Sequence, residues 1–261
     1  MKSFQGKRVL ITGASSGIGW QTALDFASEG APLLLVARRQ QRLLELAQEI
    51  RQKGAQAEVF VCDLSDYEAR IGLIEEIKAQ IGVPDVLINN AGFGNFRPFV
   101  REPFAEIVRM MRLNYEAAAH LMAAFLPEMI QRGSGAVVNI SSGAGKVALP
   151  GMAAYCASKF ALCALTESVY YETQNTGVSV HLINPGPVET EFFGAGVWDG
   201  RPPLKKATAQ QVSEAIQKAI LRNRFETYVP GLRRYIAYAF NVLKPLGRWV
   251  MVRKAANLHK L

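Results

Sequence analysis

Short apolar runs rich in Val, Ile and Leu alternate with helical patterns over the first 230 residues, and this alternation constrains the fold more than any other feature. Strand-like runs are expected at residues 8–12, 32–37, 57–62, 86–89, 135–141, 178–184 and 227–230. Helices are expected between them, at residues 17–29, 40–53, 66–80, 101–132, 152–175 and 209–222. Strands that are apolar on both faces are typical of a parallel sheet covered by helices on each side. We therefore predict an α/β fold with a seven-stranded, doubly wound parallel sheet.

No internal repeat and no linker rich in Ser, Pro or Gly interrupts this alternation. A length of 261 residues suits one large α/β domain, and 49% hydrophobic residues exclude a disordered chain. We predict that residues 1–230 form one domain. Residues 231–261 do not continue the alternation, and we interpret them as a helical appendix of the same domain.

The net charge of +8 is concentrated in one segment. Residues 222–261 contain nine basic residues and one acid, Glu226, whereas the remaining 21 basic and 21 acidic residues balance. The charge therefore marks a local surface, and nucleic acid is the least favoured partner, because the segment is more apolar than phosphate binding requires.

The basic appendix also contains apolar and aromatic residues, mainly at positions 236–243 and 246–252, with Lys244 and Pro245 between them. No uncharged apolar run reaches the roughly 18 residues that a membrane span needs. We interpret residues 232–254 as a helical segment that lies on an anionic membrane surface. The alternatives are a helix docked on the substrate cleft or on a partner subunit.

The N-terminal residues show no signal-peptide pattern, and the three cysteines form no Cys-x-x-Cys pair. These features favour a reducing compartment and argue against a cysteine-based metal site. The three histidines also have no ligand spacing, so no metal is expected. We expect a cytoplasmic protein whose appendix could attach it to the inner face of a membrane.

A glycine-rich turn follows the first predicted strand and opens the first helix. In such a turn, backbone N–H groups and the helix N-terminus can bind a pyrophosphate. The alternative is a tight strand–helix turn that needs glycine for backbone reasons alone. The residues of the turn that are candidates for dinucleotide binding are Gly13, Ser15, Ser16, Gly17, Ile18 and Gly19.

Arg38 and Arg39 follow the second predicted strand, and no acid occurs there until Glu45. An acidic residue at this place would accept hydrogen bonds from a ribose 2′-hydroxyl, whereas arginine suits a 2′-phosphate. The pair therefore favours NADP(H) over NAD(H). The alternative is an ordinary basic first turn of the following helix.

Tyr155 and Lys159 lie four residues apart in a helical pattern and so on one helix face, and Ser142 directly follows the fifth predicted strand. Together with the glycine turn and Asn114, these residues occur in the order and spacing of the short-chain dehydrogenase/reductase family. The chain resembles this family over about residues 5–230. The other matching positions are Asp63, the segment Asn89-Asn90-Ala91-Gly92, and the segment from Asn184 to Thr190.

The resemblance implies a Rossmann fold and a catalytic set of Asn114, Ser142, Tyr155 and Lys159. Tyr155 would be the general acid/base, and Ser142 would bind the substrate oxygen. Lys159 would bind the nicotinamide ribose and lower the pKa of Tyr155, and Asn114 would hold a water that continues the proton relay. General chemistry agrees, because a phenol with a pKa of about 10 is a poor base unless a cation favours its charged form.

The resemblance also implies the remaining cofactor contacts. Asp63, next to Leu64, would bind the adenine, and Asn90, Ala91 and Gly92 would pass close to the adenosine ribose. The nicotinamide end would be held by Pro185, Gly186, Val188 and Thr190, with Tyr155 and Lys159. Taken singly, Asp63 could instead cap a helix and Asn114 could satisfy buried backbone groups.

The expected activity is NADP(H)-dependent interconversion of a carbonyl and an alcohol. The alternative is a non-catalytic NADP-binding redox sensor or scaffold, which would have no need of Tyr155. The resemblance implies that residues 191–203 form a lid, whose Phe and Trp residues suit a lipophilic substrate. The alternative is that these aromatic residues pack on the end of the sheet. The resemblance further implies a homodimer or homotetramer formed through helices 101–132 and 152–175.

Overall fold

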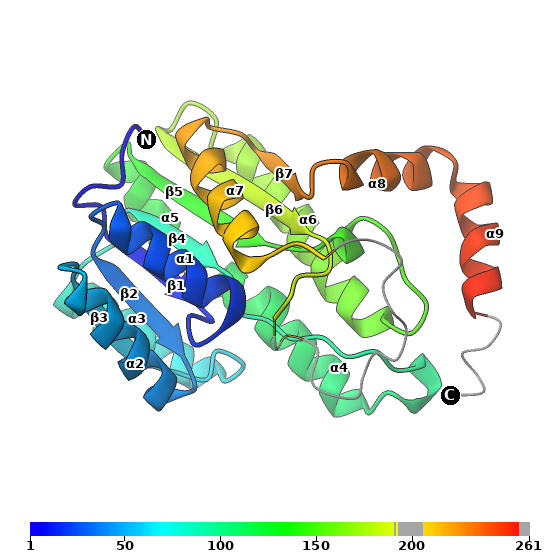
Figure 1. Ribbon diagram of the computed structural model, residues 1–261, viewed down its shortest axis with the longest axis horizontal. Helices are drawn as coiled ribbons and strands as arrows, with labels where there is room; N and C mark the ends of the chain where they lie inside the picture. The colour runs from blue at the N-terminus through cyan, green and yellow to red at the C-terminus, as the bar shows by residue number, and fades with distance from the viewer. Residues whose placement is uncertain (191, 193–205, 256–261) are drawn as a thin grey trace.

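The structure is a computed structural model that describes residues 1–190, 192 and 206–255, and it contains one seven-stranded parallel sheet (Figure 1). The strand order is β3-β2-β1-β4-β5-β6-β7, and every pair is parallel. The predicted doubly wound α/β fold is therefore confirmed. The strands are β1 (Val9–Thr12), β2 (Leu33–Ala37), β3 (Ala57–Val61), β4 (Val86–Asn89), β5 (Gly135–Ile140), β6 (Val178–Pro185) and β7 (Glu226–Val229).

Helices cover both faces of the sheet, which explains why its central strands are apolar on both sides. One face packs against α1 (Gly17–Ser28), α2 (Gln40–Gln52) and α7 (Ala209–Leu221). The other face packs against α3 (Tyr67–Gln80), α5 (Ala117–Gln131) and α6 (Ala153–Glu172). Every residue of β1, β2 and β4 is buried, so these strands form the centre of the core.

Strand β1 pairs with β2 on one side and with β4 on the other, so the strand order reverses at this point. Successive connections then leave toward opposite faces, and folds of this kind have their ligand-binding crevice at such a point, here the carboxyl ends of β1 and β4. The glycine-rich turn lies at this crevice because it joins β1 to α1. The fold thus positions the predicted dinucleotide site at the topological switch point.

The predicted long helix at residues 101–132 is interrupted in the structure. A 3₁₀ turn (Phe99–Arg101) precedes α4 (Phe104–Met111), and a π-helical turn (Arg112–Glu116) separates α4 from α5. The apolar pattern did not predict this turn, because a π turn is a local change in backbone hydrogen bonding with no residue signature of its own. Asn114 lies within the π turn, which is a common location for functional residues.

Two helices, α8 (Arg233–Val242) and α9 (Lys244–Ala255), follow β7 and extend away from the sheet (Figure 1). They confirm the predicted helical nature of the C-terminal segment, whereas the division of the chain at residue 230 remains a proposal. Within the described part of the chain, no helix combines the length and hydropathy needed to cross a bilayer.

Candidate active site

Three glycines of the turn after β1 permit close backbone approach. Gly13 and Gly17 have φ values of +68° and +56°, in the left-handed region that favours glycine. A β carbon at Gly19 would lie 2.4 Å from the Gly13 carbonyl oxygen, and one at Gly17 would lie 2.9 Å from Thr190 Cγ2. The turn is therefore packed so tightly that larger residues would displace it, and Ile18 contributes to the core below it.

The N-terminus of α1 has unsatisfied N–H groups. Ser16 is the N-cap residue, but its side chain makes no capping hydrogen bond, and no acidic residue occurs in the first turn. The first N–H groups of a helix need an acceptor, and together with the helix dipole they favour an anion. This end of α1 can therefore bind a phosphate group.

Arg38 and Arg39 lie against the glycine turn and the end of β3. Arg39 donates from Nε to the Ser15 hydroxyl at 3.2 Å and from Nη2 to the Ser15 carbonyl at 3.2 Å. Arg38 Nη1 lies 3.6 Å from Asp63 Oδ2, and about half of each side chain is exposed. The four predicted residues Ser15, Arg38, Arg39 and Asp63 are thus close together at one end of the crevice.

Asp63 does not cap α3, which is the role that its position also allowed. Its Oδ1 accepts hydrogen bonds from the backbone N–H and the hydroxyl of Ser65, and Asp66 is the residue that caps the helix. Burial opposes ionisation of Asp63, but the bonds from Ser65 and the Arg38 charge outweigh it and lower its pKa. Leu64 is buried, and its carbonyl accepts a bond from Arg70.

Asn90 joins the end of β4 to the glycine turn. Its Nδ2 donates to the carbonyl oxygens of Thr12 and Gly13, at 2.9 and 3.3 Å. Thr12 Oγ1 in turn accepts the backbone N–H groups of Asn90 and Ala91, both at 2.9 Å. These bonds hold the two sides of the crevice together, and they leave the Asn90 amide engaged with protein.

Tyr155 lies on the first turn of α6 and is 5% exposed. Its ring meets Phe192 edge-on, with 5.7 Å between centroids, and a β carbon at Gly94 would lie 2.8 Å from its Cδ2. Burial raises the pKa of Tyr155 above its usual range, while a hydrogen bond with the Ser142 hydroxyl opposes that rise. The hydroxyl is therefore protonated at neutral pH in this structure.

Lys159 is 3% exposed and lies one helical turn beyond Tyr155. Its Nζ donates to the Ile140 carbonyl at 2.9 Å and lies 6.0 Å from the centroid of the Tyr155 ring. Burial lowers the pKa of Lys159 to about 8. Desolvation is the largest influence on the Tyr155 pKa, and the expected lowering of that pKa by Lys159 stays a prediction.

Asn114 uses its side chain on protein groups. Its Oδ1 accepts the Phe93 N–H at 3.0 Å, and its Nδ2 donates to the Phe93 carbonyl and the Ser158 hydroxyl, both at 2.9 Å. A β carbon at Gly92 would lie 3.0 Å from Asn114 Oδ1 and 3.5 Å from Lys159 Nζ. The structure therefore brings Gly92, Asn114 and Lys159 together behind Tyr155.

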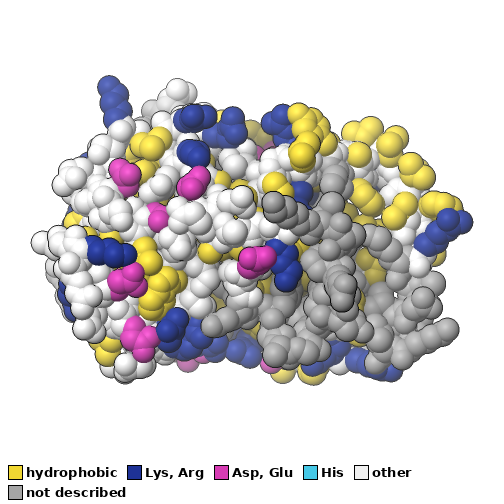
Figure 2. Space-filling view, in the orientation of Figure 1, with side chains coloured by type: hydrophobic (Ala, Val, Ile, Leu, Met, Phe, Trp, Pro, Cys, Tyr) yellow, Lys and Arg dark blue, Asp and Glu magenta, His cyan; other side chains and the backbone are white. Residues whose placement is uncertain are grey.

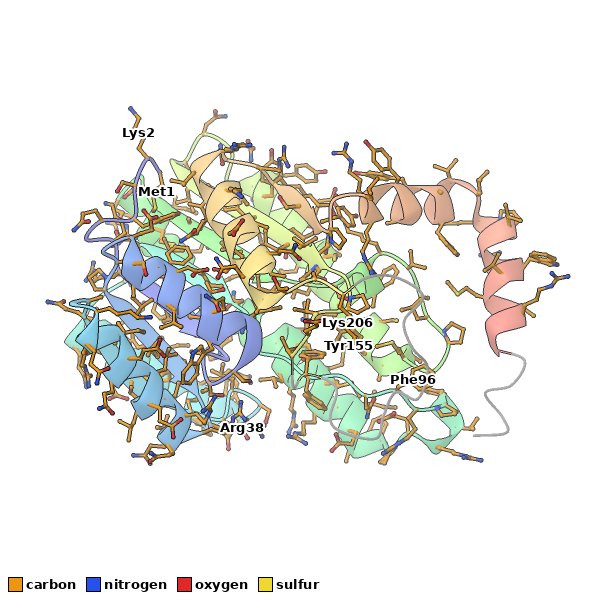
Figure 3. The ribbon with its side chains drawn as sticks, viewed as in Figure 1. Met1, Lys2, Arg38, Phe96, Tyr155 and Lys206 are labelled. Atoms are coloured by element: carbon orange, nitrogen blue, oxygen red, sulfur yellow. The ribbon has the colours of Figure 1, made fainter. Side chains whose placement is uncertain are left out.

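Ser142 and the end of β6 form the other wall. Ser142 Oγ accepts the Ala144 N–H at 3.1 Å in the 3₁₀ turn Gly143–Gly145. Pro185 is the last residue of β6, and the Gly186 N–H donates to the Val229 carbonyl. Val188 packs on the core, and Thr190 reaches Gly17. Figure 3 shows Arg38 at one end of this carboxyl edge of the sheet and Tyr155 further along it.

The predicted lid at residues 191–203 lies outside the described residues, except for Phe192. Phe192 packs with Phe93 and Phe96 on the apolar cluster that contains Tyr155. Because that cluster also includes Met110 and Met152, the surroundings of the Tyr155 ring are apolar.

The sequence profile of the family described as short chain dehydrogenase matches residues 7–197. The chain belongs to the short-chain dehydrogenase/reductase family. It is 42% identical over 257 residues to a fatty acyl-CoA reductase of Acinetobacter baylyi, covering 94% of this chain and 85% of that protein. It is 34% identical over 242 residues to the human epidermal retinol dehydrogenase 2, covering 91% of this chain and 78% of that protein.

Another relative of this short-chain dehydrogenase/reductase is a short chain dehydrogenase of Pseudocercospora fijiensis, 39% identical over 190 residues. That match covers 72% of this chain and 62% of that protein. Among solved structures, a short-chain dehydrogenase from Sphingobium yanoikuyae in complex with NADPH has a TM-score of 0.82 and 31% identity. It covers 94% of this chain and 95% of that chain.

Sequence reasoning missed several residues that build the site of this dehydrogenase/reductase. Thr12 and Ser158 supply the hydroxyls that bond Asn90 and Asn114, and Gly94 makes room for Tyr155. Lone Thr, Ser and Gly residues have many uses, so none carried a signal by itself. The motif residues around them did, because their order and spacing were specific.

Proposed function

We propose that this chain is an NADP(H)-dependent oxidoreductase that interconverts a carbonyl and an alcohol on a lipophilic substrate. The observation that carries the proposal is the buried Tyr155 hydroxyl, which bonds Ser142 and lies beside Lys159. This group lies along the same sheet edge as the glycine turn and the arginine pair. Acid/base and dinucleotide-binding residues in one crevice suit nicotinamide-dependent redox chemistry.

The residues of the crevice fit NADP(H). The N-terminus of α1 and the glycine turn would hold the pyrophosphate, since their N–H groups lack a capping acceptor. Arg38 and Arg39 would bind the 2′-phosphate, and Asp63 and the 90–92 segment would contact the adenosine. Pro185, Gly186, Val188 and Thr190 would hold the nicotinamide end, together with Tyr155 and Lys159. When bound, the cofactor supplies or accepts the hydride.

The protein's own contribution is proton transfer and placement. In the reduction direction, Tyr155 would donate its proton to the substrate oxygen, and the Ser142 hydroxyl would donate a hydrogen bond to the same oxygen. The Lys159 cation would then stabilise the phenolate that remains. Asn114, in the π turn behind Lys159, would hold the water through which the proton is replaced.

Two observations support a lipophilic substrate. The Tyr155 hydroxyl is approached through an apolar cluster of Phe93, Phe96, Met152 and Phe192. A site lined by aromatic and aliphatic side chains with few polar groups favours apolar ligands. In addition, two of the similar proteins are named for fatty acyl-CoA and for retinol, both of which are lipophilic.

We also propose that α8 and α9 attach the enzyme to an anionic membrane surface. Residues 232–255 include six basic and no acidic residues. Eight large apolar side chains of this segment are exposed, and most of them follow one another at intervals of three or four residues. They are Leu232, Tyr235, Tyr238, Val242, Leu243, Leu246, Trp249 and Val252, each more than half exposed. Figure 2 shows hydrophobic side chains over this part of the molecule, with basic side chains at the rim.

Apolar and basic side chains together suit an interfacial position, where the apolar groups enter the acyl boundary and the cations meet anionic headgroups. The Arg253 guanidinium lies over the Trp249 ring, 3.5 Å from its centroid. In this arrangement both side chains can lie at the boundary between headgroups and acyl chains. Attachment would bring the site to lipophilic substrates dissolved in the bilayer.

We further propose a homodimer or homotetramer formed through α5 and α6. Exposed apolar side chains on these helices support it, notably Ile130, Phe160 and Tyr171. Native mass spectrometry tests the assembly.

The competing function is a non-catalytic NADP-binding sensor or scaffold. Turnover of a panel of long-chain aldehydes, retinal-like aldehydes and aryl ketones, followed by nicotinamide absorbance, distinguishes the two. We expect turnover by the wild type and a loss of at least about 100-fold in kcat for Tyr155→Phe, which should still bind NADPH through the glycine turn and the arginine pair. Equal turnover by both proteins would refute the role of Tyr155, and NADPH binding without turnover of any carbonyl would favour the sensor.

A further inference from the structure

Arg233 is the first residue of α8; the residue is half-buried, and two nitrogens of its guanidinium, Nε and Nη2, are buried without a hydrogen-bond partner. Neither Nε nor Nη2 is accessible to solvent or makes a hydrogen bond. Within the described part of the chain, no carboxylate pairs with it. Burial lowers the pKa of this guanidinium, but arginine stays charged at any physiological pH. Burying the nitrogens of a cation without a counter-ion costs free energy. We therefore expect an anion from outside the chain to bind the Arg233 guanidinium.

The guanidinium lies directly on Gly186, at the carboxyl end of β6. A β carbon at Gly186 would lie 2.3 Å from Arg233 Cζ and 2.4 Å from its Nε and Nη1. Any side chain at position 186 would therefore displace the guanidinium. Backbone hydrogen bonds hold Gly186 and Arg233 close to each other. The Gly186 N–H donates to the Val229 carbonyl, and the Arg233 N–H donates to the Pro230 carbonyl.

This position is next to the proposed reaction centre. Gly186 follows Pro185, whose carbonyl oxygen lies 3.9 Å from where a β carbon of Gly143 would lie. Gly143 in turn follows Ser142, which would bind the substrate oxygen. Arg233 therefore lies on the wall of the site that runs from Ser142 toward the C-terminal helices.

The phosphates of a dinucleotide would lie elsewhere. Gly17, where the glycine turn joins the N-terminus of α1, lies against Thr190, which is four residues beyond Gly186. The arginine pair lies further away, at the ends of β2 and β3 on the other side of the switch point. An anion at Arg233 is thus expected to come from the substrate and not from the cofactor.

We propose that Arg233 binds a carboxylate or phosphate carried by the substrate, so that the natural substrate is an anionic amphiphile. This proposal rests on the proposed function, because it takes the reacting carbonyl to lie at Ser142 and Tyr155. The apolar cluster around Tyr155 accommodates the lipophilic part, and Arg233 recognises the charged group. A guanidinium is suited to this role because it presents several donors in one plane.

The test compares two aldehydes of equal length, decanal and 10-oxodecanoate, which differ in a terminal carboxylate. Arg233→Met removes the charge at similar length, Arg233→Lys keeps the charge, and Arg222→Met makes the same change at an exposed position on the C-cap of α7. We expect Arg233→Met to lower kcat/KM for 10-oxodecanoate by about 10- to 100-fold and to leave decanal unchanged. Arg233→Lys should fall between, and Arg222→Met should match the wild type.

Binding measurements keep the inference separate from catalysis. Decanoate should raise the Tm of the NADP-loaded wild type, and this shift should be lost in Arg233→Met but kept in Arg222→Met. Decanol is the neutral control, whose shift should be equal in all three. This readout still decides the role of Arg233 if no aldehyde is turned over.

Three outcomes would overturn the proposal. Equal losses for decanal and 10-oxodecanoate would make Arg233 a structural residue. A weaker NADPH affinity in Arg233→Met, with substrate preference unchanged, would assign the guanidinium to a cofactor phosphate. Inorganic phosphate that protects the wild type as well as decanoate does, without any preference for 10-oxodecanoate, would make it a general anion site.

Discussion

The ammonium group of Lys159 lies 6.0 Å from the centroid of the Tyr155 ring and donates to the carbonyl of Ile140. The two side chains come from adjacent turns of one helix, yet burial affects them in opposite ways. It raises the pKa of the Tyr155 phenol and lowers the pKa of the Lys159 ammonium to about 8. In each case burial favours the neutral form, so the charged pair forms only when proton transfer creates a phenolate.

This relationship predicts the pH dependence of carbonyl reduction. Lys159 is cationic below about pH 8 and loses its charge above it, whereas Tyr155 remains protonated across that range. The reaction therefore loses the cation that stabilises the phenolate, and kcat/KM for reduction should fall as pH rises through about 8. Initial rates at saturating NADPH measure the pH dependence of kcat/KM. A pH profile that stays flat to about pH 9.5 would contradict the role of Lys159.

Gly94→Ala should impair catalysis without a change at any catalytic residue. The new methyl group would lie 2.8 Å from Tyr155 Cδ2, so the buried ring must move. Moving a reacting group by as little as about 1 Å can lower the rate by up to about 100-fold, so we expect kcat to fall by about 10- to 100-fold. Gly72→Ala is the matched control, because a β carbon there meets nothing within 4 Å and α3 should gain up to about 1 kcal/mol in stability. Equal kcat values for the two variants would show that Gly94 does not position Tyr155.

Arg38→Asp should shift cofactor preference from NADPH toward NADH. The substitution removes a guanidinium expected at the 2′-phosphate and adds an acid that repels phosphate and suits a 2′-hydroxyl. We expect the Kd for NADPH to rise by about 10- to 100-fold and the Kd for NADH to fall. Fluorescence titration measures both, and Arg42→Asp, on the next turn, is the control because Arg42 packs over Trp20. If wild type binds both cofactors equally, Arg38 does not discriminate between them.

The sequence predicted the fold well because the information is local. Seven apolar runs separated by helical patterns predict a doubly wound parallel sheet with right-handed crossovers, and all seven strands appear. The interruption of helix 101–132 was not predicted, because the π turn at Asn114 is a local rearrangement of backbone hydrogen bonds that no residue type specifies.

The site was predicted through motif spacing, and its electrostatics were not. Spacing placed Tyr155 and Lys159 on one helix face, as the structure has them. The direction of the Tyr155 pKa shift depends on burial by Phe192, Gly94 and their neighbours, which are distant in sequence. No sequence pattern indicated Arg233 as a binding residue either. The burial of its Nε and Nη2 without a partner follows from its packing against Gly186.

His181 should make the protein sensitive to mild acid. It is fully buried in β6, bonded to the Arg224 carbonyl at 2.8 Å and the Ser179 hydroxyl at 2.9 Å, and burial lowers its pKa to about 4. In the unfolded chain its pKa is about 6.5. At pH values between the two pKa values, His181 is therefore protonated in the unfolded state and neutral in the folded state. Stability is therefore lost as pH falls from about 6.5 toward 4, by up to about 3 kcal/mol.

Urea denaturation of the wild type and of His181→Gln at about pH 7 and about pH 5 measures this effect, because the variant cannot be protonated in that window. The loss of stability between the two pH values should be smaller in the variant. His120→Gln, at a partly exposed histidine on α5, should keep most of the wild-type loss. Equal losses in wild type and His181→Gln would mean that His181 does not titrate with unfolding.

The C-terminal helices should bind anionic vesicles through two separable contributions. Each basic residue near an anionic surface contributes about 1 kcal/mol, and salt weakens this part, whereas burial of exposed aromatic groups persists at high salt. In sedimentation with phosphatidylserine-containing vesicles, the wild type should pellet at low salt and partly at high salt. Lys244→Gln with Arg248→Gln should weaken binding mainly at low salt. Tyr238→Ser with Trp249→Ser should leave binding that high salt abolishes.

Controls separate this surface from other exposed apolar groups. Tyr67→Ser, at an exposed aromatic residue on α3, should bind like the wild type, and neutral phosphatidylcholine vesicles should bind more weakly. Truncation after Gly231 should abolish binding at both salt concentrations. If the full-length protein stays in the supernatant at low salt as the truncated one does, the apolar stripes of α8 and α9 face a protein surface instead. A change in native mass on truncation would then identify that surface as a second copy of the chain, since loss of a helix docked on its own cleft leaves the oligomeric state unchanged.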